Sequence, residues 1–249
     1  MREILADNYK KIEERVYHAC ERCGRNPDDI TVVWVSKTKP RDLIESAWEA
    51  GARVFGENRA QEVVEKFPLP GQKSCELHFI GRLQSNKVRQ VLPVCQCIES
   101  VDSVRLLKRI DTICGEIQFK RDVFLQVNTS GEDTKAGFSP ESLLEKMPEI
   151  ASSSQQLCIK GLMTIGPFVD VSTGDGERVV RKSFRDLALL LKEIKSRYSD
   201  KTGVLSPEGQ FLRQFHSLSM GMSSDFELAI EEGSHYIRIG TNLFGTRMR

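Results

Sequence analysis

A continuous run of apolar, mostly β-branched residues, ITVVWVS at positions 30–36, most constrains how this chain folds. Hydrophobicity that is continuous rather than alternating is typical of a strand buried on both faces, as in a parallel sheet covered by helices. The segment RDLIESAWEA follows Pro40 with a helical pattern and ends at Gly51. The run therefore predicts the first strand–helix unit of a parallel α/β fold.

The same strand–helix unit recurs to the end of the chain. Further predicted strands are ARVF at 52–55, LHFI at 77–80, a weak strand at 97–99, and then DVFLQV, IKGLMT, HSLSM and HYIRI. Predicted helices lie between them at 57–66, 85–92, 102–114, 140–150, 177–197 and 224–232, with loops at 168–176 and 199–213. Eight such units without a composition break predict one (β/α)8 TIM-type barrel over residues 1–249, with an additional N-terminal helix ending near Gly24. No glycine-rich fingerprint follows the first strand, which argues against a dinucleotide-binding fold.

Composition argues against several classes of partner. Lysine and arginine total 36 against 35 acidic residues, so the chain has no excess positive charge for nucleic acid or an anionic membrane. No apolar stretch approaches the roughly 20 residues that span a bilayer, and the N-terminus is too acidic for a targeting signal. Seven cysteines suit a reducing compartment, and we interpret the close pairs Cys20/Cys23 and Cys95/Cys97 as buried thiols rather than metal ligands. We therefore predict a cytoplasmic protein without a bound metal.

Candidate functional residues follow the strands, because the site of a (β/α)8 barrel lies at the carboxyl ends of its strands. The loops after strands seven and eight often bind phosphate in such barrels, and here they are rich in Ser and Gly. The alternative is that these serines only cap and turn the chain. Lys37 is either a solvated strand-end lysine or a partly desolvated amine that can attack an aldehyde. The candidates are Lys37, Asn58, Ser219, Ser223, Arg238, Gly240 and Thr241.

Three other features are interpreted as structural or left open. The segment from Ser224 to Glu227 matches a capping box that would open the helix after strand seven. His78, in an apolar strand, is interpreted as a hydrogen-bonded core residue rather than a catalyst. Lys135 is either a solvated loop lysine or a cofactor contact at the rim.

Five segments and the N-terminal helix carry a resemblance to a known family. The segments are VSKTKP, FGENRAQE, HFIGRLQSNK, GLMTIG and LSMGMSSDFELAIEEGSHYIRIGTNLFG. Together with the helix they resemble the pyridoxal phosphate homeostasis proteins over nearly the whole chain. That resemblance implies an alanine-racemase-like barrel that binds pyridoxal 5′-phosphate (PLP) as a Schiff base on Lys37. It also implies a phosphate cradle at Ser219, Ser223 and the Gly240–Thr241 backbone, with Arg238 at the pyridine nitrogen and Asn58 near the ring.

Two functions fit this resemblance, a PLP carrier without catalytic residues and a PLP-dependent amino-acid racemase. A cation at the pyridine nitrogen disfavours its protonation and weakens the ring as an electron sink. A racemase also needs a second base, and the four tyrosines are all predicted in helices or inside strand eight. We therefore expect a non-catalytic, monomeric carrier that contacts PLP-dependent enzymes transiently. The resemblance argues against a phosphate-substrate enzyme that lacks the cofactor.

Overall fold

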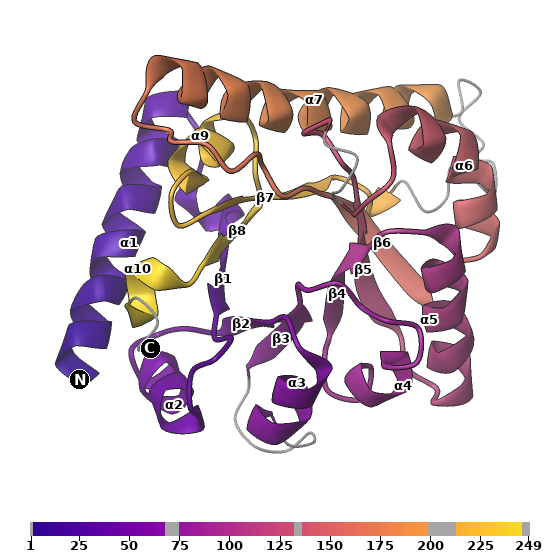
Figure 1. Ribbon diagram of the computed structural model, residues 1–249, viewed down its shortest axis with the longest axis horizontal. Helices are drawn as coiled ribbons and strands as arrows, with labels where there is room; N and C mark the ends of the chain where they lie inside the picture. The colour runs from indigo at the N-terminus through magenta and orange to yellow at the C-terminus, as the bar shows by residue number, and fades with distance from the viewer. Residues whose placement is uncertain (1, 68–74, 132–135, 199–212, 246–249) are drawn as a thin grey trace.

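The strands of this chain close into a parallel barrel in chain order, β1 to β8 (Figure 1). The computed structural model describes residues 2–67, 75–131, 136–198 and 213–245. The predicted (β/α)8 class is confirmed, including the weak fourth strand. The strands are β1 (Thr31–Val35), β2 (Val54–Glu57), β3 (Glu76–Phe79), β4 (Cys97–Val101), β5 (Arg121–Gln126), β6 (Leu157–Met163), β7 (Ser217–Met222) and β8 (Tyr236–Ile239).

Helices surround the barrel (Figure 1). The predicted additional N-terminal helix, α1 (Arg2–Cys23), packs outside against α2, α9 and α10 and buries one face that includes Ile12 and Val16. A 3-10 turn (Pro27–Asp29) leads from α1 into β1. The other helices are α2 (Arg41–Glu49), α3 (Ala60–Lys66), α4 (Val88–Val91), α5 (Val104–Glu116), α6 (Pro140–Ser152), α7 (Gly174–Tyr198), α9 (Phe226–Glu231) and α10 (Thr241–Phe244).

Several predicted boundaries are wrong. Helix α3 begins at Ala60 rather than 57, because β2 continues through Glu57 and pairs with Phe79. The loop predicted at 168–176 ends earlier, because α7 already begins at Gly174. Of the other predicted loop, at 199–213, residues 199–212 lie outside the described residues.

The capping box predicted at Ser224–Glu227 is also wrong. Asp225, not Ser224, is the N-cap of α9, and no side chain caps the helix. The Asp225 carboxylate instead accepts a hydrogen bond from the Met222 N–H at 2.6 Å. Asp225 therefore stabilises the turn between β7 and α9 rather than the first turn of the helix.

Side-chain alternation along the strands separates an apolar shell from the barrel interior. Val123 and Leu125 of β5 belong to the large apolar core, whereas Phe124 between them packs with Cys97 and Met163 in a separate small cluster. In β3, Leu77 and Phe79 likewise join the large core. His78 between them therefore faces the interior, where buried polar groups can meet across the barrel.

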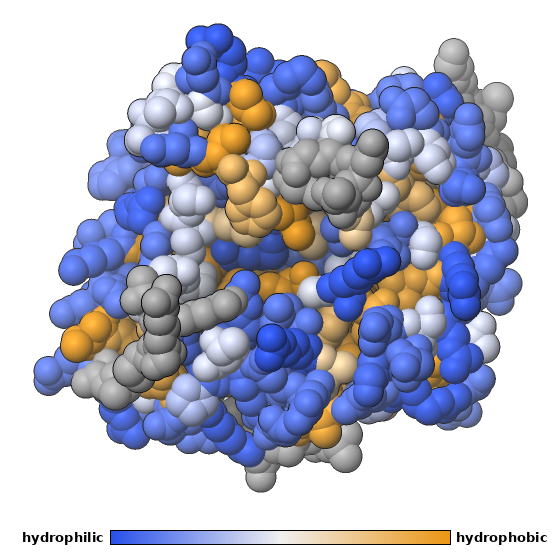
Figure 2. All heavy atoms as spheres, in the orientation of Figure 1, coloured by the Kyte–Doolittle hydropathy of each residue, from blue (hydrophilic) through white to orange (hydrophobic). Residues whose placement is uncertain are grey.

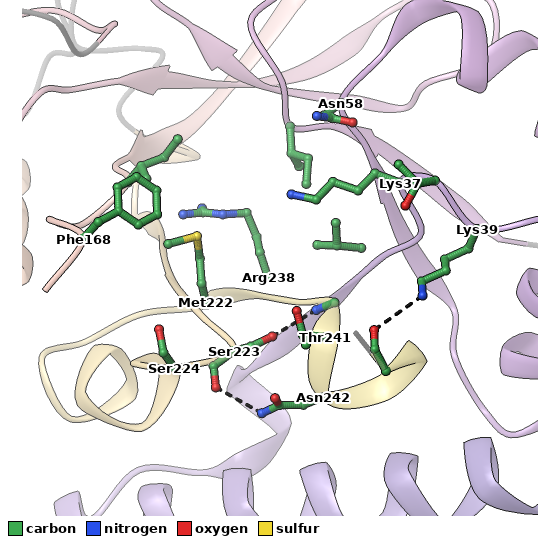
Figure 3. Close-up of a pocket in the computed structure, with 16 residues that line it drawn as sticks. Lys37, Lys39, Asn58, Phe168, Met222, Ser223, Ser224, Arg238, Thr241 and Asn242 are labelled. Carbon is green, nitrogen blue, oxygen red and sulfur yellow. Dashed lines mark hydrogen bonds between the residues drawn. The ribbon is translucent and has the colours of Figure 1, made fainter. Parts of the chain in front are cut away.

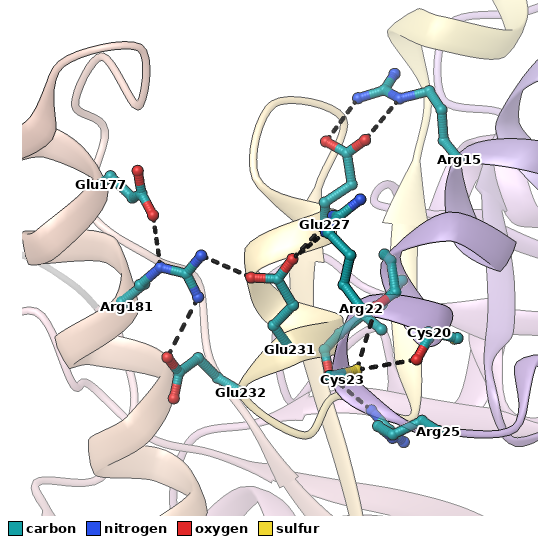
Figure 4. Close-up of polar contacts among 12 residues, drawn as sticks. Arg15, Cys20, Arg22, Cys23, Arg25, Glu177, Arg181, Glu227, Glu231 and Glu232 are labelled. Atoms are coloured by element: carbon teal, nitrogen blue, oxygen red, sulfur yellow. Dashed lines mark hydrogen bonds and ion pairs between the residues drawn. The ribbon is translucent and has the colours of Figure 1, made fainter.

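Ion pairs outside the barrel hold α9 between α1 and α7 (Figure 4). Arg15 of α1 donates to both carboxylate oxygens of Glu227, each at 3.0 Å. Arg181 of α7 donates to Glu231 at 2.6 Å, and Arg22 contacts the same carboxylate. These bridges fix the helix that follows the loop after β7. Within the described residues, no helix is both long and apolar enough to span a bilayer.

We expect Gly161→Ala to destabilise the barrel strongly. Gly161 of β6 has φ +155°, and a Cβ there would lie 1.8 Å from the Ser217 carbonyl oxygen of β7. Backbone strain and overpacking together predict a loss of about 2–5 kcal/mol in the free energy of unfolding, measured by urea titration. Gly115→Ala is the control, since a Cβ on that α5 glycine meets only the Gln156 side chain at 3.8 Å. The control should gain about 0.5–1 kcal/mol, and equal stability of the two variants would contradict the close approach of β6 to β7.

Candidate functional site

A cavity of about 620 Å³ opens at the carboxyl ends of the strands. Figure 2 shows this face hollowed near its middle, with both apolar and hydrophilic residues in the hollow. The volume falls within the range of small-molecule pockets. The structure brings six of the seven candidate residues to its wall: Lys37, Asn58, Ser223, Arg238, Gly240 and Thr241.

Ser219 is the candidate that does not reach this cavity. It is fully buried inside β7, where its hydroxyl donates to Glu99 Oε2 at 2.6 Å. The prediction that strand seven ends near Ser219 is wrong, because β7 continues to Met222. Ser219 therefore lies in the barrel interior, and Ser223 is at the rim.

The loops after β7 and β8 are joined at the cavity by Ser223. Its Oγ accepts a hydrogen bond from the Gly240 N–H at 3.2 Å, and its carbonyl accepts one from Asn242 Nδ2 at 3.0 Å (Figure 3). Ser224 and Thr241 add two more hydroxyl-bearing side chains to the same wall. Gly240 lies close to β1, since a Cβ there would be 3.3 Å from the Val35 Cβ. The two loops therefore form one polar wall with backbone and hydroxyl groups.

Lys37 is half-buried two residues after the end of β1, and its side chain extends into the cavity toward Arg238 (Figure 3). The next residue, Thr38, has φ +64°, a left-handed conformation that is uncommon for a residue with a branched side chain. The Thr38 N–H donates to Glu62 Oε2 of α3 at 2.7 Å. This bond stabilises a turn that points Lys37 at the cavity.

Lys66 of α3 stabilises the same turn through hydrogen bonds. Its Nζ donates to the Ser36 carbonyl at 2.9 Å, to Glu57 Oε1 at 3.0 Å and to Glu62 Oε2 at 2.6 Å. The Ser36 hydroxyl donates to the same Glu57 oxygen at 2.6 Å. We call Lys66, Glu57 and Glu62 the turn clamp, because together they bind the chain on both sides of Lys37.

Burial and pairing act in opposite directions on the carboxylates of the turn clamp. Desolvation raises the pKa of Glu57, and hydrogen bonds from Ser36 and Lys66 only partly oppose it. Desolvation also raises the pKa of Glu62, but the bonds from Lys66 and the Thr38 N–H outweigh it, so that pKa is lowered. Sequence analysis missed this clamp, although the four-residue spacing of Glu62 and Lys66 signals a helical ion pair.

Arg238 forms part of the cavity floor and is only 5% exposed. Its Nη1 donates to Ser219 Oγ at 2.5 Å, and its Nη2 donates to the Thr164 carbonyl at 2.7 Å. Burial lowers the pKa of the guanidinium, and the charges of Glu99 and Asp225 oppose that shift. An arginine stays protonated in proteins and can only donate hydrogen bonds. Arg238 therefore favours a hydrogen-bond acceptor in a bound ligand.

His78 lies in the interior below Arg238, and its interpretation as a hydrogen-bonded core residue is confirmed. Its Nδ1 is 2.5 Å from Glu99 Oε1, and its Nε2 is 3.0 Å from Glu76 Oε1. Desolvation lowers the pKa of His78, but the bonds to Glu76 and Glu99 outweigh it and raise the pKa to about 9. The imidazole is therefore charged at neutral pH.

The rest of the cavity wall is largely apolar, and sequence analysis did not identify it. Phe168, from the loop after β6, is 79% exposed and lies across the cavity from Lys37, beside Met222 (Figure 3). Asn58 Oδ1 is buried without a hydrogen-bond partner among the described residues. The second lysine of the turn, Lys39, donates instead to the Phe244 carbonyl at 3.2 Å.

Two further predictions concern Lys135 and the cysteine pairs. Lys135 lies outside the described residues. Cys20, Cys95 and Cys97 are buried and Cys23 is half-buried, as expected for structural thiols. Across the described ranges, no cluster of three His, Cys, Asp or Glu side chains could hold a metal ion.

Known proteins resemble this chain over nearly its whole length. The family model of the alanine racemase N-terminal domain matches residues 6–248. Pyridoxal phosphate homeostasis proteins of Aquifex aeolicus and Escherichia coli K12 are 37% and 35% identical to it. The alignments cover 97% of both chains for the first protein, and 98% of this chain and 97% of the other for the second.

Solved structures agree with the fold. PipY of Synechococcus elongatus, solved with PLP bound, superposes with a TM-score of 0.78 at 32% identity and covers 97% of this chain and 100% of PipY. An alanine racemase of Clostridium difficile shares the fold at 14% identity, with a TM-score of 0.69 over 98% of this chain but 58% of the racemase. The identity of more than 30% to the homeostasis proteins and to PipY, over almost the full length, is stronger evidence of relationship than the 14% identity to the racemase. The chain therefore belongs to the pyridoxal phosphate homeostasis protein family and carries an alanine racemase N-terminal domain.

Proposed function

We propose that this chain binds PLP in the rim cavity, holds it on Lys37 as a Schiff base, and serves PLP homeostasis without catalytic turnover. The observation that carries the proposal is the convergence of Lys37, Arg238 and the Ser223 loop on one cavity. The names of its relatives support the same function, as does PipY, a relative solved with PLP bound.

The cavity fits a flat, anionic, aldehyde-bearing ligand of this kind. Hydroxyls of Ser223 and Thr241 and the glycine backbone at 240 offer hydrogen bonds to phosphate oxygens. Arg238 offers a donor to an unprotonated ring nitrogen. Asn58 contributes an amide whose buried oxygen has no hydrogen-bond partner among the described residues, and a donor from a ligand or water would remove the cost of leaving it unpaired.

Lys37 supplies the covalent attachment in this proposal. The cofactor would supply an aldehyde, and the neutral amine of Lys37 would hold it covalently with loss of one water. The turn clamp holds the backbone of the Lys37 turn, so the amine is directed to the cavity rather than to bulk solvent. Water would release the cofactor as the free aldehyde, whereas another amine would take it over as a new imine. Either exchange would return the Lys37 amine, which suits a carrier.

The positions of the tyrosines support a carrier over a racemase. A racemase needs a base on each face of the substrate, and Lys37 can be only one of them. Tyr9, Tyr17 and Tyr198 lie on outer helices, and Tyr236 packs against Phe124 in the barrel interior. None of the four lines the cavity.

The setting of this function is also proposed. All seven cysteines are free thiols, which is usual in a reducing compartment. We propose that residues 1–249 act as one domain, as a monomer in the cytoplasm. We further propose that the chain passes the cofactor to PLP-dependent enzymes through transient contact.

The attachment to Lys37 is tested by absorption and mass spectrometry. Wild-type protein mixed with PLP should show the visible band of a protein Schiff base, and Lys37→Ala should lose it. Reduction of wild type with borohydride, digestion and mass mapping should place the cofactor on the peptide position of Lys37. Lys108→Ala, on the exposed face of α5, is the control and should keep the band. An adduct on Lys39, or no adduct, would contradict the proposal.

The absence of turnover is tested by following the α-proton of L-alanine in D2O by NMR. Loaded wild type should exchange this proton no faster than free PLP at the same concentration and without formation of D-alanine, because the cavity lacks a tyrosine base. Enzymes typically turn over at about 1 s⁻¹ or faster. Exchange at such a rate would favour the racemase instead.

Lys66→Met is expected to weaken PLP binding about tenfold, which corresponds to roughly 1.4 kcal/mol. The substitution releases the Ser36 carbonyl and leaves the buried Glu57 carboxylate without its cation, so the Lys37 turn is held less firmly. Affinity is measured by fluorescence titration well below the melting temperature. Lys182→Met, which removes an exposed ion pair with Asp186, is the control and should change affinity less than twofold. Equal affinity of the two variants would contradict the role of the turn clamp in PLP binding.

A further inference from the structure

Four ionisable side chains follow one another through the barrel interior. Arg238 Nη1 at the cavity floor is 3.6 Å from Glu99 Oε2, and Glu99 Oε1 is 2.5 Å from His78 Nδ1. His78 Nε2 is 3.0 Å from Glu76 Oε1, at the first residue of β3, where the side chain is 46% exposed. This row of four side chains therefore runs from the cavity to the opposite rim of the barrel.

The charges along this row of side chains alternate in sign. Both ring nitrogens of His78 face carboxylate oxygens, which accept hydrogen bonds and cannot donate them when ionised. Both nitrogens must then carry protons, so His78 is an imidazolium. Desolvation alone would raise the pKa of Glu99, but the bond and charge of His78 outweigh it, so that pKa is lowered. Glu99 is thus an anion between two cations.

Ser219 connects Glu99 to Arg238 by two hydrogen bonds. The Ser219 hydroxyl has one proton, and it donates that proton to Glu99 Oε2 at 2.6 Å. Its oxygen then accepts from Arg238 Nη1 at 2.5 Å, while Nη2 is fixed by the Thr164 carbonyl at 2.7 Å. Two N–H groups of the guanidinium are therefore bound to the protein, and its plane is fixed relative to the cavity.

We infer that Glu99 is a positioning residue for Arg238: held by His78, it fixes the guanidinium as a cationic donor at the cavity floor. The cavity then selects an aromatic ligand whose facing ring nitrogen is unprotonated. This inference rests on the proposed function for the identity of the ligand. The arrangement of Glu99, Ser219 and Arg238 can be tested without any ligand.

Within the described residues, the other charged and aromatic groups near these four side chains do not reach Arg238 through hydrogen bonds. Tyr236 of β8 packs its ring 5.9 Å from the His78 ring. Lys160 of β6 and Asp122 of β5 lie at the far end of this row, where Lys160 is 3.6 Å from Asp122 and adds positive charge near Glu76. Asp225 acts on Arg238 by charge only, since its carboxylate is bound to the Met222 N–H. Glu99 is the carboxylate connected to Arg238 by a continuous hydrogen-bond path through Ser219.

The first arm of the test uses cofactor-free protein and ¹⁵N NMR. Wild type should show resolved, slowly exchanging guanidinium N–H signals of Arg238, assigned with Arg238→Lys, and imidazolium shifts for His78 at pH 7. Glu99→Gln should average the Arg238 signals and lower the titration midpoint of His78 by at least one pH unit. Glu149→Gln, which breaks an ion pair between the outer helices α5 and α6, should change neither readout.

The second arm uses PLP labelled with ¹⁵N at the ring nitrogen. In wild type the ring nitrogen should stay unprotonated from pH 6 to 9. In Glu99→Gln it should begin to protonate within that range, and affinity should fall at least tenfold. Should wild type bind no PLP, the proposed function fails, while the cofactor-free arm still decides this inference.

The inference is overturned when Glu99→Gln folds, as judged by its melting curve, and keeps the Arg238 and His78 signals of wild type. Ser219→Ala covers the case in which Glu99→Gln does not fold, because it keeps all four charges and removes only the connecting hydroxyl. Loss of the slowly exchanging Arg238 signals in Ser219→Ala supports the inference. Retention of those signals contradicts it.

Discussion

The parallel pairing of β1 with β8 is the contact on which the candidate site depends. Trp34 lies opposite Ile239 in this ladder, so the first and last strands end at the same rim. Lys37 lies two residues after β1 and Arg238 lies near the end of β8, although about 200 residues separate them in the chain. Closure of the barrel thus converts two strand ends into one wall, and the close approach of Gly240 to Val35 leaves little room for a side chain between them.

Below that wall, the barrel interior differs from the apolar layer outside it. Buried charges are costly unless each has an opposite partner. Here Glu99 lies between His78 and Arg238 in the interior, and the turn clamp, between the end of β2 and α3, sets Lys66 between two carboxylates. Both groups of charges lie under residues that line the cavity. The polar interior is therefore best understood as support for the cavity rather than as a source of net stability.

Sequence patterns predicted the eight strand–helix units correctly but placed several of their ends wrongly. The end of strand seven shows why. Gly221 signals a turn by composition, yet it adopts φ +96° inside β7, where the pairing with β8 shifts register between Ser219 and Met222. An irregularity of this kind depends on the neighbouring strand. The predicted capping box failed for a local reason, because the Asp225 carboxylate accepts from the Met222 N–H in the turn before the helix.

The sequence by itself determined the alternation of strands and helices, the strand-end positions of Lys37 and Arg238, and the resemblance to one family. These follow from local periodicity and from motifs that are contiguous in the chain. Only the tertiary structure decided that Ser219 lies in the interior, that Lys66 holds the Lys37 turn, and that Glu99 connects His78 with Arg238. Those contacts join residues from separate strands and helices, and strand register and barrel closure, not sequence spacing, set the distances between them.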